Sequence, residues 1–205
     1  MTQKQKEFIE QIKPGSILTY VKYNVLPSLT LAQAVLESNW GTSELAINAN
    51  NLFGIKWSKD CGFNYYLKKT KEYVNNKWIT VEAYFRKYKD INESIEDHGV
   101  FLTKPRYAKV LTSKDYKEAA NEVWIAGYAT DPNYPSKLCR LIEKNKFYEV
   151  DDMVTSWEYK IGCEAIDELY KKGFINNPDY WKAKDLKNEA TPLWLFFEMQ
   201  RRFLK

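Results

Sequence analysis

Glu37 stands near the end of an otherwise apolar segment, Leu31-Ala-Gln-Ala-Val-Leu-Glu-Ser-Asn-Trp-Gly41. Apolar and small residues recur here at helical spacing, which predicts a helix that Ser28 caps and Gly41 ends. Glu37 then lies in the last turn, where the negative end of the helix dipole and burial both raise the pKa of a carboxyl group. A carboxylic acid that keeps its proton near neutral pH can serve a glycoside hydrolase as general acid. An isolated Glu at a helix end is more often structural, so the neighbouring segments must show whether Glu37 is catalytic.

Other reactive side chains are sparse. The single histidine, His98, falls in a predicted helix over 92–102, where a structural role is the more common one, and one histidine excludes a multi-histidine metal site. Cys61, Cys139 and Cys163 form no CxxC pair, so we expect free thiols and neither a zinc site nor a disulfide framework. The sequence therefore predicts no metal and no cofactor.

The composition is that of a globular protein with a sizeable core. The 205 residues are 44% hydrophobic, which fits one domain of about 150 residues and a smaller one. The net charge is +4 and the basic residues are spread along the chain, which does not indicate a nucleic-acid footprint. Mild basicity suits an anionic polymer such as a bacterial cell wall. No apolar run is long enough to cross a membrane.

Hydrophobic periodicity predicts a mainly helical fold with one small β-hairpin. The hairpin covers 63–88, where apolar and polar residues alternate, with Asn75-Asn76-Lys77 as its turn. A first helix over 3–22 is expected to be interrupted near Pro14-Gly15. Further helices are predicted over about 91–103, 113–126 and 135–147, with Asp90 and Ser113 as N-caps of the first two and a loop over 128–135.

A second unit is predicted after residue 150. Asp151-Asp152 reads as the start of a linker, and a new helical pattern runs from Ser156 to Gly173. A short element follows at Asn177-Pro178, and Thr191-Pro192 begins a last helix. The predicted domains are therefore 1–150 and a three-helix appendage over 151–205, which could bind wall polymer, mediate oligomers or cover the first domain.

Four segments, in order, resemble glycoside hydrolase family 73, the peptidoglycan-cleaving N-acetylglucosaminidases of autolysins, flagellar proteins and phage lysins. They cover about residues 1–150, and a hairpin lies between the second and the third, as in that family. The segments are Leu29-Thr-Leu-Ala-Gln-Ala-Val-Leu-Glu-Ser-Asn-Trp-Gly41, Asn50-Asn-Leu-Phe-Gly-Ile-Lys56, Ala83-Tyr-Phe-Arg-Lys-Tyr88 with Glu93-Ser-Ile-Glu-Asp-His98, and Gly127-Tyr-Ala-Thr-Asp-Pro-Asn-Tyr134.

The resemblance implies a lysozyme-like fold whose hairpin flanks a sugar cleft, and two catalytic carboxylates. Glu37 matches the general acid of the family. The hairpin usually supplies a second carboxylate, which we assign to Glu72 in Thr70-Lys71-Glu72-Tyr73, with Glu82 as a rival. Glu72 would act as a base for water, giving inversion, or would orient the N-acetyl group of the substrate, giving retention.

The resemblance also implies a set of supporting residues. Tyr134 matches the loop tyrosine of the family, and we expect it to take part in catalysis by hydrogen bonding or stacking on a sugar. Tyr128, Asn51, Phe53 and Ser38 are expected to bind substrate. For Phe53 the alternative is core packing, and for Ser38 it is a helix-end hydroxyl bonded to a backbone carbonyl.

The expected function is hydrolysis of the β-1,4 bond after N-acetylglucosamine in peptidoglycan glycan strands, with no nucleic-acid or membrane partner. One alternative is a lytic transglycosylase or muramidase of the same superfamily, and another is a non-catalytic wall-binding protein. The first residues contain no apolar signal region. We therefore expect a phage-type lysin held in the host cytoplasm until lysis, or a wall protein whose leader was removed. The oligomeric state is not predicted.

Overall fold

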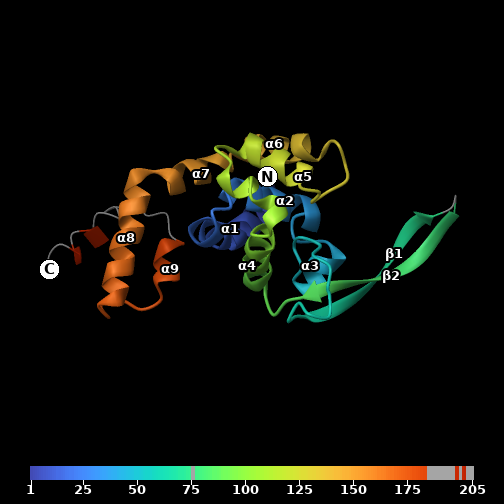
Figure 1. Ribbon diagram of the computed structural model, residues 1–205, viewed down its shortest axis with the longest axis horizontal. Coiled ribbons are helices and arrows are strands. Elements are labelled where there is room, and N and C mark those ends of the chain that lie inside the picture. Colours follow the sequence, from blue (N-terminus) through green and yellow to red (C-terminus); the bar gives the residue numbers. More distant parts are fainter. Residues whose placement is uncertain (75–76, 184–196, 199, 202–205) are drawn as a thin grey trace.

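The computed structural model describes residues 1–74, 77–183, 197–198 and 200–201, and only the backbone at 70–74, 77–81 and 157. The described part is mainly helical, with one two-stranded antiparallel sheet (Figure 1). The strands are β1 (Asn64–Val74) and β2 (Lys77–Lys87), and the helices are α1 (Gln3–Tyr23), α2 (Pro27–Ser38), α3 (Glu44–Ala49), α4 (Ile91–Leu102), α5 (Tyr116–Ile125), α6 (Tyr134–Asn145), α7 (Tyr148–Thr155), α8 (Trp157–Lys171) and α9 (Pro178–Lys182), with short 3-10 turns at Pro105–Tyr107 and Val110–Thr112.

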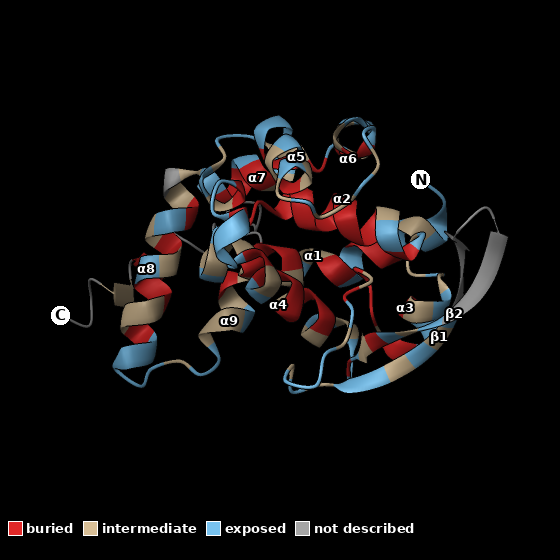
Figure 2. Cartoon of the chain, turned by 45° about the vertical axis from the view of Figure 1, so that its right-hand side comes forward, coloured by how far each residue is buried: buried red, intermediate tan, exposed pale blue. Residues whose placement is uncertain are grey.

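Helix α2 is the centre of the main core. It packs against α1, α5, α6 and α7, and Figure 2 shows it buried along most of its length. Leu29, Leu31 and Ala32 are fully buried, as the apolar spacing predicts. Truncating one such leucine to alanine typically costs about 2–5 kcal/mol, so this packing holds the end of the helix, and Glu37 with it, in place.

The start of α2 is capped by a carboxylate from a distant part of the chain. Pro27 takes the first helical position, and Ser28 lies one residue later, so Ser28 is not the N-cap that the sequence predicts. Instead, the backbone N–H of Ser28 donates to Asp151 Oδ1 at 2.8 Å, and its hydroxyl donates to Asp151 Oδ2. Asp151 lies within α7 and is buried, so the predicted linker at this residue is wrong. The capping contact spans the chain, which no local pattern reveals.

The end of α2 is a run of three left-handed residues. Asn39, with φ of 49°, is the C-cap, and Trp40 and Gly41 follow with φ of 59° and 75°. The helix therefore ends two residues before the predicted Gly41, because an asparagine also tolerates this conformation. Gly41 is required for a second reason, since a Cβ there would lie 2.6 Å from the ring of Phe8.

Helix α1 is continuous through Pro14, so the predicted interruption is wrong. Proline removes one helical hydrogen bond. The residues on either side of it hold the helix, because Ile12 and Ile17 are each only 1% exposed. Gly15 allows α1 to approach α4 closely, since a Cβ there would lie 3.0 Å from Ile95.

The hairpin projects from the helical body (Figure 1), and its base is held by polar contacts. Arg86 of β2 donates to both oxygens of Asp97 in α4 at 2.7 Å, and the hydroxyl of Tyr88 donates to the same carboxylate at 2.6 Å. On the side of α3, Glu44 accepts a hydrogen bond from Tyr66 and pairs with Lys68. The hairpin is therefore anchored to two helices of the body.

The remaining boundaries follow the predictions closely. Asp90 caps α4 as predicted, and the short element predicted at Asn177-Pro178 is α9, with Asn177 as its N-cap. Helix α5 is capped by Asp115 rather than by Ser113, since the Asp115 carboxylate accepts from two backbone N–H groups. The predicted loop over 128–135 ends earlier, because α6 begins at Tyr134. The predicted hairpin turn and the last helix lie outside the described residues at 75–76 and 184–196.

The C-terminal helices share a second hydrophobic cluster with the first part of the chain. Ile17 of α1 and Val154 of α7 pack there with Ile166 and Leu169 of α8. Lys22 of α1 also pairs with Asp179 of α9 at 2.9 Å. These contacts join α8 and α9 to the body, while the division into domains 1–150 and 151–205 stays a prediction.

The Asp151 cap predicts a pH dependence of stability. Burial raises the pKa of Asp151 to about 6, although the hydrogen bonds from Ser28 favour the charged form. The unfolded pKa is about 3.9, so between about pH 4 and 6 the native state binds more protons, and this group destabilises the fold as the pH rises. We expect Asp151→Asn to remove a slope of up to about 3 kcal/mol, measured as unfolding free energy at pH 4, 5, 6 and 7.

The control for this experiment is Glu149→Gln, which replaces another exposed carboxylate of the same helix. It should leave the slope unchanged. Parallel pH curves for the parent and Asp151→Asn would show that Asp151 titrates as it does in the unfolded chain, against our account.

Candidate active site

Glu37 is held at the end of α2 by a tyrosine from another helix. Its carboxylate accepts a hydrogen bond at 2.8 Å from the hydroxyl of Tyr134, the first residue of α6. Glu37 is exposed to solvent, yet the surrounding protein displaces enough water to raise the pKa of its carboxyl group, while the hydrogen bond from Tyr134 lowers it. The net direction is upward, as the sequence predicts, and burial is the main cause.

Two further side chains continue this contact into the core. Gln33 donates from Nε2 to the hydroxyl oxygen of Tyr134 at 3.0 Å, and its Oε1 lies 3.1 Å from His98 Nε2. Burial lowers the pKa of His98 to about 3, so its ring is neutral, and Nε2 must carry the hydrogen that Gln33 Oε1 accepts. His98, Gln33 and Tyr134 therefore form a chain of donors, each directed to the next, that ends on Glu37.

Gln33 is a site residue that the sequence analysis did not single out. It precedes Glu37 by four residues, so both lie on one face of α2, and it is a fully buried amide within an apolar helix. A buried polar group needs hydrogen-bond partners, and that requirement is the signal that points to it.

Aromatic rings pack around the donor chain. Phe53 stacks on His98 with ring centroids 3.9 Å apart and an interplanar angle of 10°. Tyr128 stacks on Tyr134 at 6.0 Å and meets His98 edge-on at 6.1 Å. These contacts restrict the rings and thereby fix the position of the Tyr134 hydroxyl.

Three of the predicted substrate-binding residues lie inside the protein. Ser38 is fully buried, donates to the carbonyl of Ala34 and accepts from the N–H of Gly41, so it has the helix-end role. Asn51 is 1% exposed, and its amide joins the backbones of Ile55 and Arg86.

Phe53 is 3% exposed beneath the donor chain. The burial of Ser38, Asn51 and Phe53 corrects the prediction that they touch substrate: the three support the site from behind. Tyr128 is half-buried, and its hydroxyl makes a long hydrogen bond of 3.4 Å to the carbonyl of Phe53. The structure thus places Tyr128 beside Tyr134, and its role in binding substrate stays a prediction.

For the predicted second carboxylate, Glu72, the structure describes the backbone alone. Glu72 lies in β1 opposite Ile79, and its side chain is outside the described residues. Its rival, Glu82, is exposed on β2 opposite Lys69, a position that also suits an outward-facing strand residue without a catalytic role.

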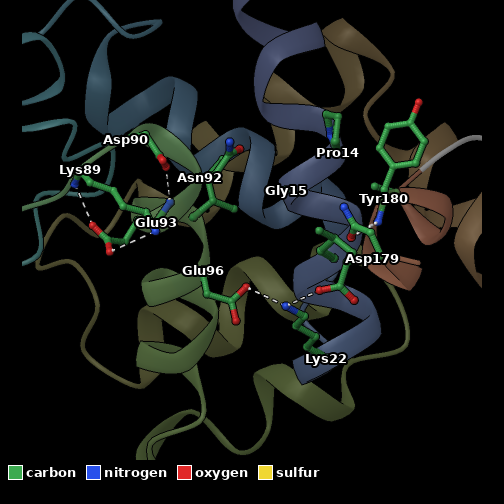
Figure 3. Close-up of a pocket in the computed structure, with 14 residues that line it drawn as sticks. Pro14, Gly15, Lys22, Lys89, Asp90, Asn92, Glu93, Glu96, Asp179 and Tyr180 are labelled. Atoms are coloured by element: carbon green, nitrogen blue, oxygen red, sulfur yellow. Dashed lines mark hydrogen bonds and ion pairs between the residues drawn. The ribbon is translucent and has the colours of Figure 1, made fainter. Parts of the chain in front are cut away.

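A large groove lies elsewhere. It has a volume of about 800 Å³ and runs between α1, the start of α4 and α9 (Figure 3). Its carboxylates are already engaged: Lys22 pairs with Glu96 and Asp179, Asp90 caps α4, and Glu93 accepts from the backbone of Lys89. Each of these acids is engaged in an ion pair, a helix cap or a backbone hydrogen bond, so the groove is a weaker candidate for acid–base chemistry than the surroundings of Glu37.

Among the residues that the structure describes, no three His, Cys, Asp or Glu side chains gather as metal ligands. No described helix is long and apolar enough to cross a bilayer.

Comparison with known proteins decides the family. Residues 16–147 match the Glucosaminidase family, described as mannosyl-glycoprotein endo-beta-N-acetylglucosaminidase. The chain belongs to this family. It is therefore a glycoside hydrolase, as the resemblance implies. A relative, the exo-glucosaminidase LytG of Bacillus subtilis, is 42% identical over 98% of this chain and 78% of its own length.

Solved structures of relatives share the Glucosaminidase fold. The catalytic domain of the autolysin Auto from Listeria monocytogenes is 37% identical, with a TM-score of 0.65 over 74% of this chain and 89% of that one. A Staphylococcus aureus structure titled N-acetylmuramoyl-L-alanine amidase is 25% identical, with a TM-score of 0.64 over 94% of this chain and 51% of that one. The mainly helical, lysozyme-like architecture with a small hairpin is confirmed.

The hydrogen bond between Tyr134 and Glu37 predicts a change in the pH profile of hydrolysis. Tyr134→Phe removes a donor that favours the charged carboxylate, so the pKa of Glu37 rises further. Because the acid must be protonated, the decline of activity on the alkaline side should move to higher pH. The rate on cell walls should fall by roughly tenfold or more, since the acid also loses its orientation.

A matched control exists in the same chain. Tyr116 donates to Glu143 at 3.0 Å on the surface, and Tyr116→Phe should leave the profile unchanged. An alkaline limb that stays in place in Tyr134→Phe would refute the coupling.

Proposed function

We propose that the chain is a peptidoglycan hydrolase that cleaves the β-1,4 bond after N-acetylglucosamine, with Glu37 as general acid. The observation that carries the proposal is the raised pKa of an exposed carboxyl group that Tyr134 holds in a fixed position within a Glucosaminidase fold. The names of two relatives, the exo-glucosaminidase LytG and the autolysin Auto, support it.

Burial and the hydrogen bond from Tyr134 shift the pKa of Glu37 in opposite directions, and each suits one stage of the proton transfer. Burial raises the pKa of the carboxyl group and so favours the protonated form that donates to the glycosidic oxygen as the C1–O bond breaks. The hydrogen bond from Tyr134 then stabilises the carboxylate that remains. The surroundings of Glu37 thus favour the acid before the proton transfer and its conjugate base after it.

Glu72 is the proposed second carboxylate. It would activate a water molecule, giving an inverted product, or orient the N-acetyl group of the substrate, giving a retained one. A separation of about 6.5–9.5 Å from Glu37 in the substrate complex leaves room for that water. The anomer first released from a chitooligosaccharide decides between the routes, because an α product excludes the substrate-assisted one.

Exo-acting cleavage is a second candidate, since the relative LytG is named an exo-glucosaminidase. Mass spectrometry of products from intact walls separates the modes: monosaccharides indicate end-wise cleavage, and muropeptide chains with reducing N-acetylglucosamine indicate internal cleavage. Reducing N-acetylmuramic acid would indicate a muramidase, and anhydro products a transglycosylase.

Loss of the acid should abolish hydrolysis without unfolding the protein. Glu37→Gln keeps a side chain that can accept the hydrogen bond from Tyr134, but it has no proton to give. We expect cell-wall clearing to slow by roughly 10²–10⁴-fold, with binding to walls retained. Glu143→Gln, at the matched Tyr–Glu pair, should clear walls like the parent. Equal clearing by Glu37→Gln and the parent would remove Glu37 as the acid.

The hairpin offers a matched pair of variants for the second carboxylate. If Glu72 assists the reaction, Glu72→Gln should reduce the turnover rate by roughly 10²-fold or more, while Glu82→Gln on the other strand stays near the parent. Rates are measured on walls at the optimum pH of the parent. The reverse order of effects would assign the role to Glu82.

A further inference from the structure

An exposed group of aromatic side chains lies on one face of the hairpin base. Trp57, Tyr65 and Tyr84 have ring centroids 5.2–6.2 Å apart, and Leu67 lies opposite Tyr84 across the strands. Tyr65 is 53% exposed, Tyr84 43% and Leu67 40%. We call these four residues the aromatic platform.

The platform is held in place by the backbone. The N–H of Trp57 donates to the carbonyl of Tyr84 at 2.9 Å, so the chain at Trp57 runs alongside β2. The indole N–H donates to the carbonyl of Phe63 at 2.7 Å, which fixes the orientation of the ring. Rings that are held in advance lose little conformational freedom when a ligand covers them.

The platform faces away from α3. Successive residues of a strand point to opposite faces. Tyr66 and Lys68 contact Glu44 of α3, so Tyr65 and Leu67 belong to the opposite face. This surface therefore lies on the face opposite α3, and Arg86, which shares the face, ties its base to Asp97 of α4.

Large apolar side chains that gather on a surface usually mark an interaction site. Phe85, the neighbour of Tyr84 in β2, is buried in the body, so the hairpin places one aromatic residue in the core and leaves the next one exposed. Among the described residues, no hydrogen-bond partner is found for the hydroxyls of Tyr65 and Tyr84, which are thus available to a polar ligand.

Positive charge is concentrated around the platform. Residues 56–89 contain nine Lys or Arg and three Asp or Glu, a net charge of +6, whereas the whole chain carries +4. The remainder of the chain is therefore slightly acidic. Lys69 is exposed on the same face as Leu67, and Lys56 and Lys87 are exposed at neighbouring positions on the opposite face. An anionic ligand is favoured here over a neutral or cationic one.

We propose that the aromatic platform binds a peptidoglycan glycan strand at a site separate from the reaction centre. The apolar faces of the sugars would stack on the rings, and the carboxylates of the peptide stems would be attracted by the surrounding lysines. Only three residues separate Trp57 from Phe53, which stacks on His98 in the donor chain, so a strand held here stays near Glu37. The inference rests on the proposed function for its choice of polymer.

The test is co-sedimentation with purified sacculi from which teichoic acid has been stripped. The full chain carries Glu37→Gln, so that binding is measured without cleavage. Adding Tyr65→Ser and Tyr84→Ser should raise the apparent dissociation constant roughly tenfold, because two stacking faces are lost. Tyr65→Leu with Tyr84→Leu keeps apolar bulk for the hairpin and should weaken binding as well. Tyr170→Ser with Phe174→Ser removes equally exposed aromatic residues of the C-terminal part and should bind like the parent.

Other outcomes would overturn the proposal. Unchanged affinity of folded platform variants shows that the rings do not bind the wall. Binding to untreated walls alone identifies a phosphate polymer as the occupant, and platform-dependent binding of a DNA duplex that exceeds binding to sacculi identifies nucleic acid. A failure of the proposed function would instead show as no wall clearing by the parent with Glu37, which this binding assay does not require.

Discussion

The hydrogen bond from Tyr134 to Glu37 is the contact on which the site depends. It joins the end of α2 to the start of α6, and its donor can point in only one direction, because Gln33 already donates to the tyrosine oxygen. The neutral ring of His98 completes the chain from within the core. An exposed acid is thus positioned by groups that are themselves buried, which is how a fixed geometry can coexist with access for a substrate.

The rest of the fold serves to hold the two ends of α2. Asp151 of α7 caps its start, although burial of that carboxylate opposes its charge. The left-handed turn through Asn39 and Trp40 ends it one residue after Glu37. Backbone in this conformation is costly for a tryptophan and persists only where the surroundings enforce it. The helix therefore has a defined length, and Glu37 a defined place in its last turn.

Periodicity and capping residues were sufficient to predict the class of fold and the hairpin, whereas the resemblance to a known family pointed to Glu37 and Tyr134, which the structure places in contact. Local patterns failed where the deciding partner is distant in sequence. Ser28 has the chemistry of a cap, but Asp151 reaches it from 123 positions away and takes that role. Asn51 and Phe53 belong to a family motif, yet tertiary packing buries them, and a motif alone cannot separate residues that touch a ligand from those that support them. Gln33 has no local signal of its role, because its hydrogen-bond partners Tyr134 and His98 are distant in sequence.

The central claim is that Glu37 remains protonated at higher pH than an ordinary glutamate while it accepts a hydrogen bond from Tyr134. The most direct measurement is a titration of the Glu37 side-chain carboxyl carbon by NMR, assigned by comparison with Glu37→Gln. The account predicts a pKa above the ordinary value of about 4.3. A midpoint at or below that value would contradict it, because the carboxyl group would then be ionised where hydrolysis requires its proton.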